Sequence, residues 1–165
     1  MDRMRINFML TMLIVLVAGC GDTGDSQNAP AAGGDGVPTF EVDPFWPKPL
    51  PNHWVLGSAI GVTVDAEDHV WIVHRGNGAP STEHGAAQDP PTGECCLPAP
   101  NVLEFDQEGN LLSSWGGPGD GYDWPQSNHG IGVDPMGNLW IGGNGDDDAH
   151  ILVFAQDGTF LKQFG

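Results

Sequence analysis

Hydrophobic and polar positions alternate over short stretches in two parts of the chain, and this is the period of β-strands. Gly-Val-Thr-Val-Asp at 61–65 and Val-Trp-Ile-Val at 70–73 are two such stretches, separated by a polar turn. The pattern returns as Gly-Ile-Gly-Val-Asp at 130–134 and Leu-Trp-Ile-Gly at 139–142, and the Met-Gly-Asn turn between them suits left-handed conformations. β-Branched and aromatic residues fill the strand positions, so each part predicts a strand–turn–strand unit.

A second pattern also occurs twice, after each of these units. Val-Leu-Glu-Phe-Asp-Gln-Glu-Gly at 102–109 leads into an apolar segment at 111–116, and Ile-Leu-Val-Phe-Ala-Gln-Asp-Gly at 151–158 leads into one at 160–165. Each copy predicts two strands around a glycine-containing turn. Combined with the first pattern, the sequence predicts two units of four strands.

The two units form a repeat at about 58–116 and 127–165, and the first contains an insertion at 76–100 that is dense in Gly, Pro, Ala and Thr. Four-stranded sheets repeated in this way are typical of β-propeller blades. We therefore expect an all-β fold over 40–165, and the matched spacing argues against the alternative, an antiparallel sandwich. Closed propellers need roughly 4–8 blades, so the sequence predicts a partial propeller and a chain truncated relative to its parent.

The N-terminal segment has the pattern of an export signal. Arg3 and Arg5 precede an apolar run at 8–18, which is too short to cross a bilayer because spanning needs roughly 20 residues. The run ends in Val-Ala-Gly-Cys at Cys20, which resembles the lipoprotein box of bacteria, where the signal peptide (here 1–19) is removed and the cysteine carries lipid. This resemblance implies a lipid anchor to the membrane through Cys20, in the bacterial cell envelope, facing the periplasm or the exterior. An ordinary buried cysteine and an uncleaved anchor helix are the alternatives.

Composition limits what the chain can fold and bind. The segment at 20–39 is rich in Gly, Ala, Asp and Pro without apolar periodicity, and this predicts a disordered tether. The net charge is −17, and Lys48, Arg75 and Lys162 are the only lysines or arginines after Cys20. Because no basic patch can form, we expect no nucleic-acid partner, and membrane attachment is left to the lipid.

The three cysteines would be an odd number for an exported protein, but a lipid on Cys20 leaves the adjacent pair Cys95 and Cys96. Neighbouring Cα atoms lie about 3.8 Å apart, which is shorter than the ~4.4–6.8 Å usual for a disulfide. A bond between the two therefore requires a distorted geometry. Free thiols, pairing with cysteines outside the chain, and metal binding by the pair are the alternatives.

The repeated pattern Gly-hydrophobic-x-Val-Asp, followed by a turn and then hydrophobic-Trp-Ile, resembles the NHL repeat. The stretch at 56–76 contains Gly-Val-Thr-Val-Asp and ends in Val-His-Arg-Gly, and it is similar to the opening blade of the peptidyl-α-hydroxyglycine α-amidating lyases. Members of that family are six-bladed NHL propellers that hold zinc and calcium. They cleave a C-terminal α-hydroxyglycine into a peptide amide and glyoxylate.

This resemblance implies chemistry at two residues. The catalytic Arg of the family falls on Arg75, and its zinc-binding His falls on His129, in His-Gly-Ile-Gly-Val-Asp at the start of the second unit. An arginine can hold a substrate carboxylate through two parallel hydrogen bonds, and a neutral imidazole suits zinc. An ion pair between Arg75 and a nearby carboxylate, and a hydrogen-bonded loop histidine at 129, are the alternatives. The other zinc histidines and the catalytic Tyr of the family belong to later blades, so Tyr122 is not carried over.

The remaining expectations concern calcium and the overall function. The loop Gly-Asp-Asp-Asp at 145–148 offers oxygen ligands for calcium, although a solvated charge run fits the same sequence. One hypothesis is a metal-dependent lyase acting on peptidyl-α-hydroxyglycine or a similar substrate, with this chain inactive on its own. The alternative is a non-enzymatic propeller whose channel face binds a peptide or small-molecule ligand at the cell envelope.

Overall fold

The computed structural model describes residues 37–76 and 85–165. The expected signal peptide at 1–19, the lipid site at Cys20 and most of the tether therefore lie outside the described residues. A compact unit spans 43–165, and the fold below is that of this unit. Within the described ranges, no helix has the length and apolar character needed to cross a membrane.

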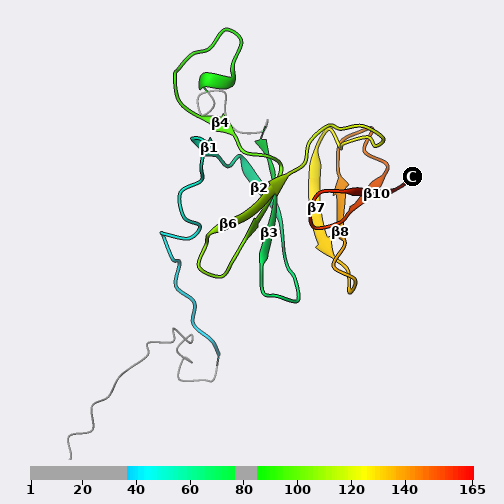
Figure 1. The fold of residues 1–165 in the computed structure, drawn as a ribbon, viewed down its shortest axis with the longest axis horizontal. Helices are drawn as coiled ribbons and strands as arrows, with labels where there is room; N and C mark the ends of the chain where they lie inside the picture. Colours follow the sequence, from blue (N-terminus) through cyan, green and yellow to red (C-terminus); the bar gives the residue numbers. More distant parts are fainter. Residues whose placement is uncertain (1–36, 77–84) are drawn as a thin grey trace, which may run out of the picture. The chain divides into compact units, whose positions relative to one another are not determined.

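The first of two four-stranded sheets has the order β2-β3-β5-β6, and every neighbouring pair is antiparallel (Figure 1). Its register places Trp71 opposite Glu104 and places Val102 opposite Trp115. The strands are β2 (Ser58–Val64), β3 (Val70–Arg75), β5 (Val102–Phe105) and β6 (Leu111–Trp115).

The second sheet repeats this arrangement with the order β7-β8-β9-β10, again antiparallel throughout. Both sheets have a register shift in the first strand at the same repeat position, before Gly61 and before Gly130. The two four-stranded sheets confirm the predicted all-β fold. Neither sheet closes on itself. The strands are β7 (Asn128–Val133), β8 (Leu139–Gly143), β9 (Ile151–Phe154) and β10 (Phe160–Phe164).

The two sheets share one hydrophobic core. Trp115 of β6 crosses to the second sheet, where its ring lies 5.1 Å from that of Phe154 and its Nε1 donates to the carbonyl of Gln156 at 3.0 Å. Burying one large apolar side chain contributes about 1.5–3 kcal/mol, so this core is the main attraction between the sheets. Its fully buried members are Trp71, Val73 and Val102 from the first sheet and Leu139, Ile141, Leu152 and Phe154 from the second.

The strands β2 and β7 approach each other closely at a glycine. A Cβ atom placed on Gly61 would lie 3.0 Å from the backbone nitrogen of Ile131 and 2.9 Å from Cγ1 of Val73. Any larger residue at 61 would therefore push the two strands apart. This contact brings the starts of the two sheets together and positions the end of β3 beside β7.

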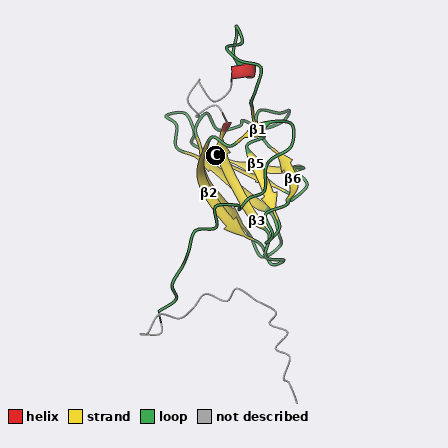
Figure 2. Ribbon diagram, turned by 90° about the vertical axis from the view of Figure 1, so that its left-hand side faces the viewer, coloured by secondary structure: helices red, strands yellow, loops and turns green. Residues whose placement is uncertain are grey.

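The opposite face of the first sheet is covered by the segment that precedes β2. Trp46 packs on Phe105 with a centroid separation of 5.5 Å, and the backbone nitrogen of Lys48 donates to the carbonyl of Gly109 at 3.0 Å. Further along the segment, β1 (Trp54–Val55) pairs in parallel with β4 (Leu97–Pro98) of the insertion. Besides these strands, the described residues include the short 3-10 helix η3 (Gly85–Ala87) (Figure 2).

Candidate functional site

Arg75 is the last residue of β3, and neutral groups hold its guanidinium. Nε donates to the backbone carbonyl of Asn128 at 3.1 Å, and Nη2 donates to Oδ1 of Asn144 at 2.9 Å. In residues 37–76 and 85–165 no carboxylate forms an ion pair with Arg75, since the ion pairs found there belong to His69. The alternative of a carboxylate partner for Arg75 is therefore not seen in this part of the chain.

A loop after β8 fixes the partner of Arg75. Oδ1 of Asn144 also accepts from Oγ of Ser127 at 2.7 Å, and the backbone nitrogen of Asn144 donates to the carbonyl of Ser127 at 2.9 Å. Position 144 is the repeat equivalent of position 75. Arg75 and Asn144, which occupy the same position in the two repeats, therefore contact each other across the two sheets.

Asp148 holds this loop closed. Its carboxylate accepts from the backbone nitrogens of Gln126 at 2.8 Å, Ser127 at 2.9 Å and Gly145 at 2.8 Å. Burial acts to raise the pKa of Asp148, but these hydrogen bonds outweigh burial and the pKa lies below its ordinary value. The acidic residues of 145–148 do not form a group of three ligand atoms with other described residues. Asp148 thus holds together the loop whose acidic residues were considered as oxygen ligands for calcium.

His129 lies on β7 directly after Asn128, whose carbonyl accepts from Arg75. The two neighbours differ in exposure, because Asn128 is buried and donates to the carbonyl of His74 at 3.0 Å, whereas His129 is exposed. The structure therefore brings the predicted catalytic arginine and the predicted zinc histidine to adjoining strand ends. In the described part of the chain, His129 belongs to no group of three His, Cys, Asp or Glu ligand atoms.

His74, which precedes Arg75, is a structural residue. It is fully buried, its Nδ1 accepts from the backbone nitrogen of Gly57 at 3.1 Å, and Nε2 lies 2.7 Å from the carbonyl of Pro100. Because a backbone N–H can only donate, Nδ1 must be unprotonated, so Nε2 carries the hydrogen. This neutral histidine joins β3 to the segments on both sides of it and positions the base of the Arg75 side chain.

A hollow of about 360 Å³ lies next to Arg75. Its lining includes polar residues, Arg75, Asn101, Gln126 and Asn128, and apolar residues, Trp124 and two prolines. The remaining guanidinium N–H groups of Arg75 have no protein acceptor among the described residues. A small anion with an attached apolar group fits this chemistry, because the guanidinium suits a carboxylate and the tryptophan suits the apolar part.

The sequence marks Arg75 as a candidate site residue but does not indicate the residues that hold it. Asn128 and Asn144 are amides in short polar stretches, and nothing local in the sequence distinguishes them from other loop residues. One signal was available, because Asn144 occupies the repeat position of Arg75. That correspondence becomes a contact only once the two sheets pack together.

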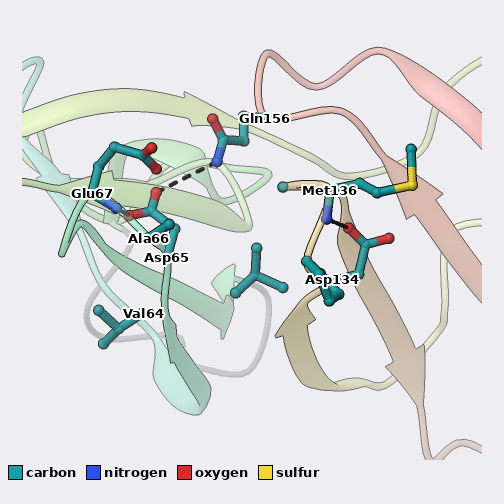
Figure 3. Close-up of a pocket in the computed structure, with 10 residues that line it drawn as sticks. Val64, Asp65, Ala66, Glu67, Asp134, Met136 and Gln156 are labelled. Atoms are coloured by element: carbon teal, nitrogen blue, oxygen red, sulfur yellow. Dashed lines mark hydrogen bonds between the residues drawn. The ribbon is translucent and has the colours of Figure 1, made fainter.

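A second hollow, of about 540 Å³, lies at the other ends of these strands (Figure 3). Asp65 and Glu67 of the β2–β3 turn form one side, and Asp134 and Met136 of the β7–β8 turn form the other. Gln156 reaches in from the β9–β10 turn, with Nε2 3.5 Å from Oδ2 of Asp65. Its walls carry acidic groups and no cation of the chain, so this hollow does not suit an anion.

Cys95 and Cys96 are joined by a disulfide in the structure, with their Cα atoms 3.7 Å apart. Cys96 has a φ of 84°, which lies in the left-handed region. The carbonyl of Cys95 accepts from the backbone nitrogen of Ala86 at 3.1 Å, which ties the pair to η3. The bonded pair therefore belongs to the insertion, and it does not line the hollow beside Arg75.

The chain matches no protein-family model, and no curated protein sequence is significantly similar to it.

Proposed function

We propose that this chain is a lipid-anchored part of an NHL-type β-propeller that binds the carboxylate of a peptide or small-molecule ligand through Arg75. The observation that carries the proposal is the environment of Arg75. Its guanidinium is held by neutral oxygens, it keeps unused N–H groups, and it lines a hollow that Trp124 and two prolines also line. In a chain of net charge −17, an arginine without a carboxylate partner in the described structure is suited to an external anion.

The propeller part of the proposal is supported by the repeat of burial between the sheets. Trp71 is 0% exposed because the second sheet covers it, whereas its repeat equivalent Trp140 is 37% exposed. Phe164, the equivalent of Trp115, is 41% exposed. A third sheet of the same kind, placed on the second as the second lies on the first, would bury both residues. Stacking of similar sheets, with one face of each sheet against the opposite face of the next, is the packing of propeller blades.

The test is a calorimetric titration with two short peptides that differ only at the C-terminus, one with a free carboxylate and one with an amide. We expect the carboxylate peptide to bind more tightly. Arg75→Gln should weaken its binding by roughly 10–100-fold, because hydrogen bonds to charged groups contribute about 1.5–3 kcal/mol. Lys162→Gln is the matched control, since it removes the same charge from β10, where Lys162 lies 4.2 Å from the ring centroid of Phe164. Equal binding of the two peptides would exclude Arg75 as a carboxylate site.

A second candidate function, peptidyl-α-hydroxyglycine lyase activity in a complete propeller, is favoured by the position of His129 next to the carbonyl that Arg75 contacts. In that reaction the bond from the amide nitrogen to the hydroxylated carbon breaks, and the hydroxyl proton is transferred to the nitrogen. The products are the peptide amide and glyoxylate. Arg75 would orient the substrate carboxylate, His129 would be one zinc ligand, and zinc, when bound, would supply a Lewis acid.

Glyoxylate release separates the lyase from the binding propeller. We expect none from this chain alone, because a catalytic zinc site takes about three protein ligands and His129 is one. In a longer form containing further sheets, the lyase hypothesis requires both zinc content and glyoxylate release from an α-hydroxyglycine peptide. If peptide binding through Arg75 is present and both of these are missing, the non-enzymatic binding propeller is the correct function.

A further inference from the structure

Three potential metal ligands converge beside the β2–β3 turn, at the end of the sheet away from Arg75. Nδ1 of His69 lies 2.9 Å from Oε1 of Glu104 and 3.6 Å from Oδ2 of Asp65. All three ligand atoms lie within 4.8 Å of one another. Contacts of about 2.0–2.2 Å to a single tetrahedral zinc ion place neighbouring ligand atoms about 3.3 Å apart. The observed separations bracket this value.

The fold holds these side chains in place. Oδ1 of Asp65 accepts from the backbone nitrogens of Glu67 at 3.0 Å and His69 at 2.9 Å, and Oδ2 accepts from Nε1 of Trp71 at 2.8 Å. Glu104 projects from β5 directly opposite Trp71 in the β3–β5 register. The ligand set therefore comes from one tight turn and one strand, β5, of the paired sheet, which is a more rigid support than a loop.

The second sheet provides an internal comparison. Asp134 and Trp140 repeat the hydrogen bond between Asp65 and Trp71, at 3.0 Å, so this bond is a feature common to both sheets. The other two positions differ, because Asn138 replaces His69 and Val153 replaces Glu104. The sheet thus forms without the histidine and the glutamate, and their presence in the first sheet alone is not required by the turn or the strand pairing.

The local charge favours a cation. The side chain of Asp65 is 2% exposed and that of Glu104 is 13% exposed, so two carboxylates are largely withdrawn from water beside one imidazole. Burial and the charge of Asp65 both raise the pKa of Glu104, although its contact with His69 opposes them. Ser113 lies across from Glu104 in the β5–β6 register. An ion here would neutralise the two carboxylates.

We propose that Asp65, His69 and Glu104 form a binding site for a divalent transition-metal cation of the Zn²⁺ type. Each carboxylate supplies one oxygen and His69 supplies Nδ1, which requires the hydrogen of the imidazole to be on Nε2. His69 has a side-chain exposure of 32%, so the site opens to solvent on its side and water completes the coordination. The site is independent of Arg75 and of any zinc at His129. It would tie β5 to the β2–β3 turn.

The test is a calorimetric titration of the whole chain with Zn²⁺ alone. We expect binding by the wild type, and we expect His69→Asn and Glu104→Val to weaken it by at least about tenfold. Loss of an outer-shell partner already costs about 10–100-fold in metal affinity, and these are direct ligands. Both substitutions introduce the residue that the second sheet has at the equivalent position, so each should preserve the fold. Far-ultraviolet circular dichroism verifies this, and Zn²⁺ should raise the melting temperature of the wild type more than that of either variant.

Two controls make the assignment specific. Glu67→Gln removes an exposed carboxylate from the same turn and should leave zinc binding unchanged. His129→Ala should also leave it unchanged, and this separates the site from the zinc role considered for His129 in the lyase hypothesis. The proposal is overturned if the wild type binds no Zn²⁺ at millimolar concentration, or if folded His69→Asn binds Zn²⁺ as tightly as the wild type.

Discussion

Asp134 organises the β7–β8 turn although it is only half-buried. Oδ1 accepts from the backbone nitrogens of Met136 at 2.8 Å and Asn138 at 2.9 Å. Oδ2 accepts from the Asn138 side chain at 2.9 Å and from Nε1 of Trp140 at 3.0 Å. The hydrogen bonds from Trp140 and Asn138 lower the pKa of Asp134 from 3.8 to about 2. Each of these bonds favours the charged form, so protonation must weaken the turn.

We therefore predict a pH-dependent stability that Asp134 contributes. Its folded pKa is lower than its unfolded pKa, so the stabilisation is complete above pH 3.8 and is lost as the pH falls through about 2. Other aspartates with lowered pKa values act in the same direction, and the comparison with Asp134→Asn isolates this residue. Denaturant unfolding followed by tryptophan fluorescence should show that the wild-type advantage over Asp134→Asn shrinks between pH 4 and pH 2. An advantage that stays constant over that range would contradict the role of the charge.

At the scale of secondary structure, both β-turns of the second sheet contain a glycine, and the two turns can be compared. Gly137 and Gly158 both have a φ of 83°, in the left-handed region that other residues adopt at a cost of about 1–2 kcal/mol. They differ in their surroundings. A Cβ atom at Gly158 would lie 2.9 Å from Cγ of Trp115, whereas at Gly137 the nearest atom, in Gln156, would be 3.5 Å away.

We predict that Gly158→Ala destabilises the fold more than Gly137→Ala does. The backbone cost should be similar in both variants, about 1–2 kcal/mol. At position 158 the tryptophan that joins the two sheets must also move, which adds about 1–3 kcal/mol, the usual cost of overpacking. Thermal unfolding of the two variants measures the difference directly. Equal decreases in stability for the two variants would show that Trp115 is free to shift and is not fixed against the β9–β10 turn.

Most strands of the structure could be predicted from the sequence, because each repeat places apolar residues with the period of a strand and ends them at a turn residue. The short pair β1 and β4 and the helix η3 could not, since the insertion has no hydrophobic period and its pairing is non-local. The cluster of potential metal ligands, Asp65, His69 and Glu104, was not predicted either, because it also depends on a non-local strand pairing. His69 and Glu104 are far apart in sequence, and only the β3–β5 register brings them together.

At the scale of the whole molecule, we predict that the chain attaches to a membrane through Cys20, which lies outside the described residues. An apolar run of the length seen at 8–18 is too short to span a bilayer, so attachment should depend on a lipid at Cys20. Metabolic labelling with a fatty-acid analogue should mark the wild type and not Cys20→Ala, and only the wild type should sediment with membranes. Labelling of Cys20→Ala to the same extent would place the lipid elsewhere or exclude the lipoprotein assignment.

The face of the second sheet that points away from the first carries large exposed apolar side chains. Trp140 and Phe164 stack there with an interplanar angle of 12° and a centroid separation of 5.5 Å, and Ile151 is 44% exposed. The equivalent positions of the first sheet, Trp71, Trp115 and Val102, pack in the core shared with the second sheet, so this face has the composition of an interface. The edge strand β10 beside it also offers unpaired backbone groups, which favours association.

We therefore predict that the chain without its first 20 residues associates in solution, with an average mass in sedimentation velocity that rises with concentration. Phe164→Asp should shift the chain towards the monomer, because a charge on this face must be desolvated for the contact to form. Met136→Asp is the matched control, since Met136 is 85% exposed on the β7–β8 turn and should leave association unchanged. A wild type that remains monomeric at all concentrations and unfolds in one sharp transition would show that the second sheet needs no further partner. That outcome would contradict the proposal that this chain is part of a β-propeller.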